Sequence, residues 1–206
     1  NPARPWVVTD RRNGRQQYVY LANFDWYNYL YDDSRPTWDH NINIKGGTKA
    51  LSYMVSGRYY QQKGVNRIEP DMFKSYNFRV KLQAEIKPWL TIASNTKFFQ
   101  SNYKYYGYED EYNNFRKPTL HALASFVPVN PDGTAVSHTS MTQSSTHYLM
   151  DGYSAMMQKG KSFGNKKTQE ITTTFEATFK LHKNFNVKAD FSYTQGYLHN
   201  DYRSVN

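Results

Sequence analysis

A strictly alternating run from Tyr76 to Ile86 constrains the fold of this chain more than any other feature. A period of two predicts a β-strand with one apolar and one polar face. At about 3.3 Å per residue and a tilt near 45°, such a strand rises roughly 25 Å, the height of the apolar band of an outer-membrane barrel. The pattern therefore predicts a transmembrane β-barrel strand. Its polar residues, expected to face the lumen, are Asn77, Arg79, Lys81, Gln83 and Glu85.

Similar alternation elsewhere predicts three antiparallel hairpins, at about 39–61, 75–102 and 168–195. The turns within the hairpins are short, whereas the connections between them, above all the loop 103–167, are long. Short periplasmic turns and long extracellular loops are typical of outer-membrane barrels. We expect residues 1–37 to be irregular and residues 119–126 to form a short helix. The predicted fold class is all-β, an antiparallel transmembrane β-barrel of which this chain supplies about six strands.

Composition excludes several other classes of protein. No segment approaches the ~20 consecutive apolar residues that a helical membrane span requires. The 206 residues include no cysteine, so there is no disulfide framework and no thiol metal site. A net charge of +9 is typical of proteins that bind nucleic acid or another anionic surface. However, the basic residues are dispersed along strands and turns, which favours a solvated polar face and loops near anionic lipid headgroups. We expect no nucleic-acid partner.

No constellation of residues points to catalysis, a cofactor or a metal, so a non-enzyme is expected. The acidic run 109–111 lacks the spacing of a calcium loop. Loop tyrosines could grip a partner or stack on a substrate, and the expected contact residues are Tyr105, Tyr106, Tyr108 and Tyr112. Other aromatic residues near strand ends suit the interfacial girdle of a barrel, namely Tyr76, Trp89, Tyr103 and Tyr193.

Several short motifs go beyond the alternation. They are the segment 24–27 (Phe-Asp-Trp-Tyr), the strand 40–48 (His-Asn-Ile-Asn-Ile-Lys-Gly-Gly-Thr), the turn 88–90 (Pro-Trp-Leu) and the loop 128–134 (Pro-Val-Asn-Pro-Asp-Gly-Thr). Together with the strand 53–64, they resemble the SusC/RagA family of TonB-linked outer-membrane transporters. Phe24 departs from the family pattern, which usually has Thr there. The similarity runs through most of residues 23–195.

This resemblance implies a barrel of about 22 strands around an N-terminal plug. It also implies a SusD-like surface lipoprotein as partner, energy from TonB, and import of oligosaccharides or peptides across the outer membrane of Bacteroidetes-type bacteria. No plug, TonB-binding segment or closing C-terminal strand is evident in the sequence, so we expect residues 1–206 to be part of one barrel domain in a longer protein. Two alternatives remain open: a soluble all-β surface carbohydrate-binding module, and a passive porin-like channel.

Overall fold

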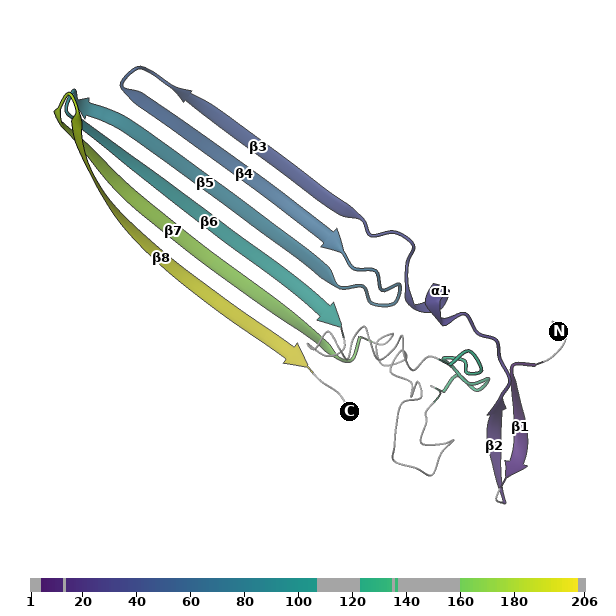
Figure 1. Cartoon of the computed structure of the whole chain (residues 1–206). Helices are drawn as coiled ribbons and strands as arrows, with labels where there is room; N and C mark the ends of the chain where they lie inside the picture. Colours follow the sequence, from purple (N-terminus) through teal and green to yellow (C-terminus); the bar gives the residue numbers. More distant parts are fainter. Residues whose placement is uncertain (1–4, 13, 107–122, 135, 137–159, 204–206) are drawn as a thin grey trace.

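A single antiparallel sheet of six long strands dominates the molecule (Figure 1). The computed structural model describes residues 5–12, 14–106, 123–134, 136 and 160–203. The strands pair in sequence order and are β3 (Thr37–Gly47), β4 (Leu51–Lys63), β5 (Met72–Lys87), β6 (Leu90–Tyr106), β7 (Phe163–His182) and β8 (Phe185–Arg203). The predicted all-β, antiparallel architecture is confirmed. The sheet is open, with β3 and β8 at its two edges.

The short connections between strands lie at one end of the sheet, and the long connections join strand ends at the other. Residues 48–50, 88–89 and 183–184 make short turns at one end; at the other end, residues 64–71 connect β4 to β5, and β6 ends and β7 begins (Figure 1). The strands extend beyond the alternating segments, and β5 to β8 contain 16, 17, 20 and 19 residues. At about 3.3 Å per residue, strands of this length exceed the roughly 30 Å hydrocarbon core of a bilayer even when tilted by about 45°.

The register of the pairing carries the alternation of β5 across the whole sheet. Val80 pairs with Val55 and Thr96, and the row continues to Ile44 on β3 and Tyr193 on β8. Paired residues of a sheet project to the same side. We call the side of the even-numbered residues of β5 the apolar face, and the side of its odd-numbered residues the polar face.

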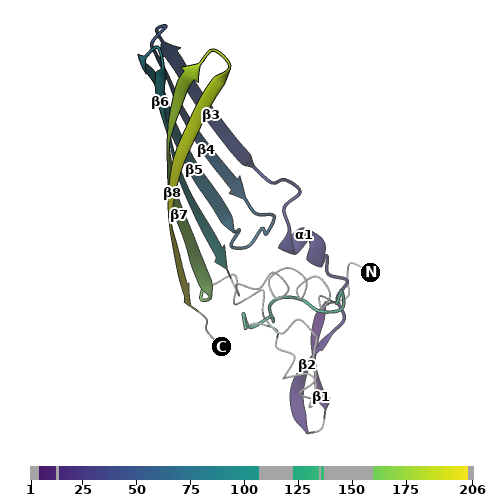
Figure 2. The ribbon, with the colours of Figure 1, turned by 60° about the vertical axis from the view of Figure 1, so that its left-hand side comes forward.

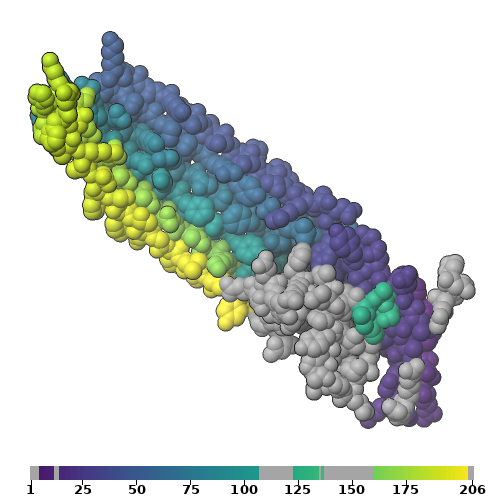
Figure 3. Space-filling view, viewed as in Figure 1, coloured from purple at the N-terminus to yellow at the C-terminus, as the bar shows by residue number. Residues whose placement is uncertain are grey.

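The apolar face has no layer packed against it among the described residues. Figure 2 shows that the sheet curls, and the space-filling view shows one face of the strands bare along most of its length (Figure 3). Large apolar side chains on the apolar face are about half exposed or more, including Ile42 (63%), Phe78 (49%), Phe175 (55%) and Phe191 (66%). Exposure of contiguous apolar surface on this scale indicates that another apolar phase or partner covers it.

Aromatic side chains border this apolar face at both ends. His40, Tyr59 and Tyr76 form a row, with ring centroids 6.3 and 5.2 Å apart. At the turn end, Trp89 stacks on Phe179 at 6.4 Å. The prediction that Tyr103 belongs to the same girdle is wrong. Tyr103 pairs with Phe73, an odd-numbered residue of β5, and therefore lies on the polar face.

The prediction that residues 1–37 are irregular is also wrong. Strands β1 (Val7–Arg12) and β2 (Arg15–Tyr20) form a hairpin whose turn contains Gly14 at φ 76°, a left-handed conformation that glycine adopts without steric cost. The short helix α1 (Trp26–Leu30) follows. Of the helix expected at 119–126, only residues 123–126 are described, and they form a turn. Among the described residues, no helix is both long and apolar enough to cross a membrane.

Candidate functional site: the polar face and the loop cluster

The polar face carries a charge pattern that the register assembles from separate strands. All five residues expected to face a lumen, Asn77, Arg79, Lys81, Gln83 and Glu85, lie on this face of β5. Arg58 donates two hydrogen bonds to Asp39, of 2.9 and 2.6 Å, and Lys188 forms an ion pair with Glu176 at 2.7 Å. Exposed pairs of this kind contribute little to stability, but they fix the positions of side chains.

Three cations at the centre of the polar face have no carboxylate partner among the described residues. Arg79 pairs across the strands with Lys97, and Lys81 lies two residues further along β5. Like charges directly opposite each other destabilise a sheet. Arg79 is held by a 2.8 Å hydrogen bond from its Nε to Oδ1 of Asn95. The arrangement leaves positive charge available to a ligand or another part of a larger protein.

Shallow hollows lie over these charges. One of about 460 Å³ includes Arg79, Lys97 and Glu170 in its lining. A second, of about 430 Å³, lies nearer the turn end and includes Lys45, Lys81 and Glu176. Both combine cationic and anionic side chains, which suits a zwitterionic or polar solute better than an apolar one.

Toward the long connections, the polar face becomes aromatic. Tyr105 stacks on Tyr103 with ring centroids 5.6 Å apart, and its ring lies over Gly164 of β7, its cross-strand partner. A Cβ at position 164 would overlap that ring, so the close approach requires glycine there. Tyr105 is only 2% exposed. It is packed within the structure rather than displayed as a contact surface.

The other expected contact tyrosines have different positions. Tyr106 is half-buried on the apolar face, where Nζ of Lys104 lies 4.9 Å from its ring centroid. Tyr105 and Tyr106 therefore belong to the end of β6, not to the loop, and they project to opposite faces. Tyr108 and Tyr112 lie outside the described residues, as does the acidic run 109–111.

A second feature, missed by the sequence reasoning, is a compact cluster at the long-connection end. We call it the loop cluster; it comprises the β1–β2 hairpin and residues 21–36, 64–71, 123–134 and 136. Its small core consists of Trp26, Leu30 and Tyr31, all buried, with Phe24 and Phe126 packed against them. The indole Nε1 of Trp26 donates a 2.9 Å hydrogen bond to the carbonyl oxygen of Leu123. Segments about 100 residues apart in the sequence thus share one core.

The N-terminus of α1 shows the local signal that could have revealed this cluster. Asp25 is the N-cap, and its carboxylate accepts a 3.0 Å hydrogen bond from the backbone N–H of Asn28. That bond lowers the pKa of Asp25 below its ordinary value. An aspartate preceding apolar residues is a recognised helix start, although five residues are too few for periodicity to be detected.

The β1–β2 hairpin is tied to the loop 128–134 by two tyrosine hydroxyls. Tyr18 donates to Oδ2 of Asp132 at 2.9 Å, and Tyr20 donates to Oδ1 of Asn130 at 2.7 Å. Hydrogen bonds from the hydroxyl and backbone N–H of Thr134 lower the pKa of Asp132, and the bond from Tyr18 acts in the same direction. The bond to Asp132 in turn raises the pKa of Tyr18.

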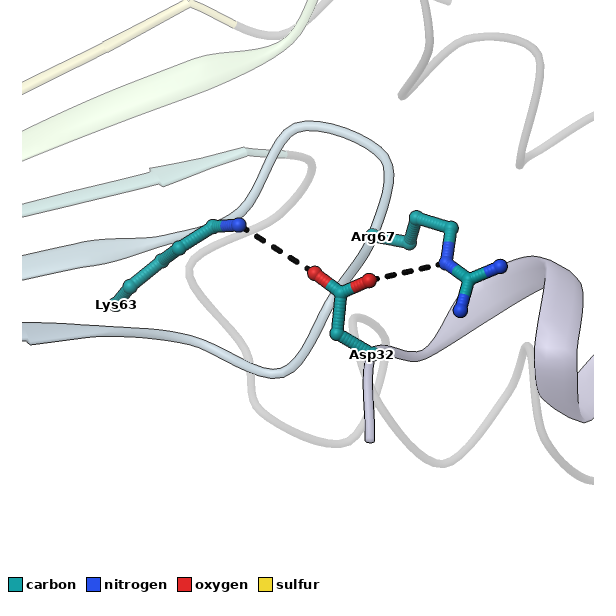
Figure 4. Close-up of polar contacts among 3 residues, drawn as sticks. All are labelled: Asp32, Lys63 and Arg67. Carbon is teal, nitrogen blue, oxygen red and sulfur yellow. Dashed lines mark hydrogen bonds and ion pairs between the residues drawn. The ribbon is translucent and has the colours of Figure 1, made fainter. Parts of the chain in front are cut away.

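Asp32 connects the loop cluster to the end of β4 (Figure 4). Its carboxylate receives hydrogen bonds from Nε of Arg67 at 3.0 Å and from Nζ of Lys63 at 3.4 Å. Backbone hydrogen bonds join the same segments, from Asp32 to Val65 and from Arg67 to Leu30, both of 2.8 Å. The Arg67 hydrogen bond, assisted by Lys63, holds the pKa of Asp32 below its ordinary value.

Within the described part of the chain, no group of three or more His, Asp or Glu side chains is placed to hold a metal ion. The polar face and the loop cluster instead offer surfaces for binding: charged hollows on the sheet, and an ordered set of loops at one end of it.

Comparison with known proteins identifies structural neighbours only. Neither a scan of protein-family models nor a search of curated proteins finds a match. Among solved structures, the chain resembles one described as the RagAB peptide transporter, with 22% identity and a TM-score of 0.58. It also resembles the RagAB peptide importer in its closed-closed and open-open states, with 21% identity and TM-scores of 0.58 and 0.59.

These alignments cover 83–87% of this chain but only 18–20% of the neighbouring chains. The chain therefore spans about a fifth of the length of the proteins it resembles. The resemblance to the SusC/RagA family is confirmed at the level of the fold.

Proposed function

We propose that this chain forms part of the barrel wall and the extracellular loops of a TonB-dependent nutrient importer of the SusC/RagA type in the outer membrane. The observation that carries the proposal is the bare apolar face, bordered by aromatic side chains and backed by a charged face. The ten residue-to-residue steps from Tyr76 to Ile86 rise about 23 Å at a tilt of 45°, close to the roughly 25 Å apolar band of such barrels.

The open edges of the sheet support the same proposal. β3 and β8 each present one unpaired edge, and β8 alone is 19 residues long. Long unpaired edges favour aggregation, and full closure into a barrel removes them. In a barrel of about 22 strands, strands outside this chain pair with both edges and complete the wall.

In this proposal the polar face lines the lumen. Asn77, Arg79, Lys81, Gln83 and Glu85 contact the solute, or the plug when it fills the barrel. Nothing is catalysed: the solute crosses when energy delivered by TonB moves the plug. Of the four tyrosines expected to make contacts, Tyr108 and Tyr112 remain candidates for the surface that meets substrate or partner.

The long-connection end faces the cell exterior and receives a SusD-like lipoprotein over the loop cluster. Peptides are the favoured substrate class, because the structural neighbours are described as a peptide transporter and importer. Mixed charge on the polar face also suits peptides, which carry charges of both signs. Oligosaccharides are the second substrate class.

A soluble carbohydrate-binding module is the competing function. A sandwich of that kind covers its apolar face with a second sheet about 10 Å away. The described residues supply no such layer, and the connections differ in length between the two ends of the sheet. A passive porin shares the barrel wall and differs by having no plug and no dependence on TonB.

Fractionation and uptake experiments on the full-length protein in its own cells test the proposal. We expect the protein in the outer-membrane fraction, with an unheated gel band that migrates differently from the heated one. Deletion of its gene should abolish uptake of labelled oligopeptides, and loss of TonB should do the same. A protein that is soluble without detergent would refute the barrel, and uptake independent of TonB would indicate a porin.

A further inference from the structure

Lysines of the apolar face gather immediately beyond its aromatic border at the long-connection end. Lys74 on β5 and Lys167 on β7 lie in one register row, with Asn102 of β6 between them. Lys104 lies two residues further along β6, on the same face. Strands are about 4.8 Å apart, so the three lysine Cα atoms surround Asn102 at distances of roughly 5–7 Å. We call these four residues the lysine triangle.

The lysine triangle lies at the level of lipid headgroups if the apolar face spans the membrane. It begins two residues beyond Tyr76, which corresponds to about 5 Å of height at a 45° tilt. The polar layer of a bilayer occupies about 5–8 Å on each side of the hydrocarbon core. Lysine side chains near the membrane border extend their ammonium groups into this layer.

The rows below the triangle match the remainder of an amphiphilic molecule. The first row contains Gln100 and Gln169, joined by a 2.7 Å hydrogen bond, in register with Tyr76 and Tyr197. The row below it contains apolar residues on three adjacent strands, Phe78, Phe98 and Ile171. From hydrocarbon to water, the surface thus changes from apolar to amide and aromatic and then to cationic.

The positive charge of the triangle is not neutralised within the described residues. No ion pair joins Lys74, Lys104 or Lys167 to a carboxylate there, and Lys104 contacts only the π face of Tyr106. Asp201 is the one acidic residue of the apolar face in these rows, and it pairs with the neighbouring His199 at 2.7 Å. Each ammonium group provides three donors, and the Asn102 amide adds two more, which suits phosphate oxygens.

We propose that the lysine triangle binds the phosphate-bearing headgroup of a lipid in the outer leaflet, with its acyl chains lying along Phe78, Phe98 and Ile171. The inference rests on the proposed function, because it requires the apolar face to contact lipid. Charge complementarity and the order of the rows select an anionic lipid over a protein partner. A bound lipid at this position orients the end of the sheet that carries the loop cluster.

Lipid binding to the purified full-length protein tests the inference. The probe is diphosphoryl lipid A, with its dephosphorylated form as the reference ligand, and binding is followed by native mass spectrometry. The test variant combines Lys74→Gln, Lys104→Gln and Lys167→Gln. The matched control combines Lys81→Gln, Lys97→Gln and Lys180→Gln, which remove the same charge from the same three strands on the polar face.

A lysine near an anionic lipid surface contributes roughly a fivefold increase in affinity, so the triple variant should bind about a hundredfold more weakly. The control should bind as the unaltered protein does, and the dephosphorylated lipid should bind weakly to all three. Unchanged binding by the triangle variant, or equal binding of the two lipids, would overturn the inference. Heat-dependent gel mobility reports the barrel separately, so its absence would refute the proposed function instead.

Discussion

A charged substitution at Leu82 tests whether the apolar face of the sheet contacts lipid or water. Leu82 lies on the apolar face, in one register row with Tyr53 and Phe175, and is 46% exposed. It follows Tyr76 by six residues, so at about 3.3 Å per residue and a 45° tilt it lies roughly 14 Å from the aromatic border. That depth is close to the middle of a 25 Å apolar band.

Arginine at the midplane of a barrel's lipid face costs about 2–4 kcal/mol. Leu82→Arg should therefore lower the folding equilibrium constant of the barrel roughly 30- to 1,000-fold. The neighbouring Gln83→Arg places the same side chain on the polar face, where water solvates it. Its cost should stay below about 1 kcal/mol, because surface substitutions rarely exceed 0.5 kcal/mol and the added charge is near Lys81.

The measurement is refolding of the full-length protein into lipid vesicles across a urea gradient, with the folded fraction read from unheated gel mobility. Leu82→Arg should move the midpoint to lower urea, and Gln83→Arg should leave it nearly unchanged. Equal effects of the two variants would refute the assignment of faces. No effect of Leu82→Arg would show that this position meets water, not lipid.

Three further outcomes concern the loop cluster and the end of the sheet. The folded pKa values of Asp32 and Asp132 lie below the ordinary 3.8, so their ionised carboxylates stabilise the loop cluster above that pH, and this stabilisation is lost as the pH falls through the lowered values. Hydrogen exchange of the α1 amides, corrected for its intrinsic rate, should therefore accelerate below about pH 4. Asp32→Asn should accelerate that exchange at neutral pH, whereas Asp33→Asn, which alters the adjacent carboxylate, should not. Equal exchange rates in the two variants would contradict a stabilising role for the ion pairs of Asp32 with Lys63 and Arg67 shown in Figure 4. Gly164→Val should destabilise the β6–β7 pairing by about 1–3 kcal/mol through overlap with Tyr105, and Tyr105→Ala in the same chain should restore part of the loss in a urea melt.

The sheet could be predicted from the sequence because its signal is local. Period-two alternation between Tyr76 and Ile86 depends only on neighbouring residues, and it sets both the strand and its faces. Strand ends are harder to predict, because polar extensions such as residues 164–167 pair through the backbone and need no apolar alternation. The prediction for Tyr103 is wrong for a related reason. The sequence shows that Tyr103 is near a strand end, but the face on which its side chain lies depends on the residue with which it pairs on β5.

The loop cluster and the lysine triangle could not be predicted, because both depend on distant residues coming together. The core around Trp26 includes Val65, from the connection between β4 and β5, and Phe126, from the connection between β6 and β7. Lys74, Lys104 and Lys167 lie far apart along the chain, so the sequence alone indicates dispersed rather than clustered basic residues. Antiparallel register brings residues about 30 and 60 positions apart into neighbouring rows, so charge clustering in a sheet must be judged across strands.

The lengths of the connections determine where this protein can acquire specificity. In an antiparallel meander, alternate connections lie at the same end of the sheet. One end here holds turns of two or three residues, which reverse the backbone and offer little side-chain surface. The other holds the loop cluster, which Asp32 joins to β4 through Lys63. Substitutions that alter solute or partner preference while leaving the amount of folded barrel unchanged should therefore fall at this end and on the polar face. Substitutions on the apolar face should change the amount of barrel and leave the preference of the remaining protein intact.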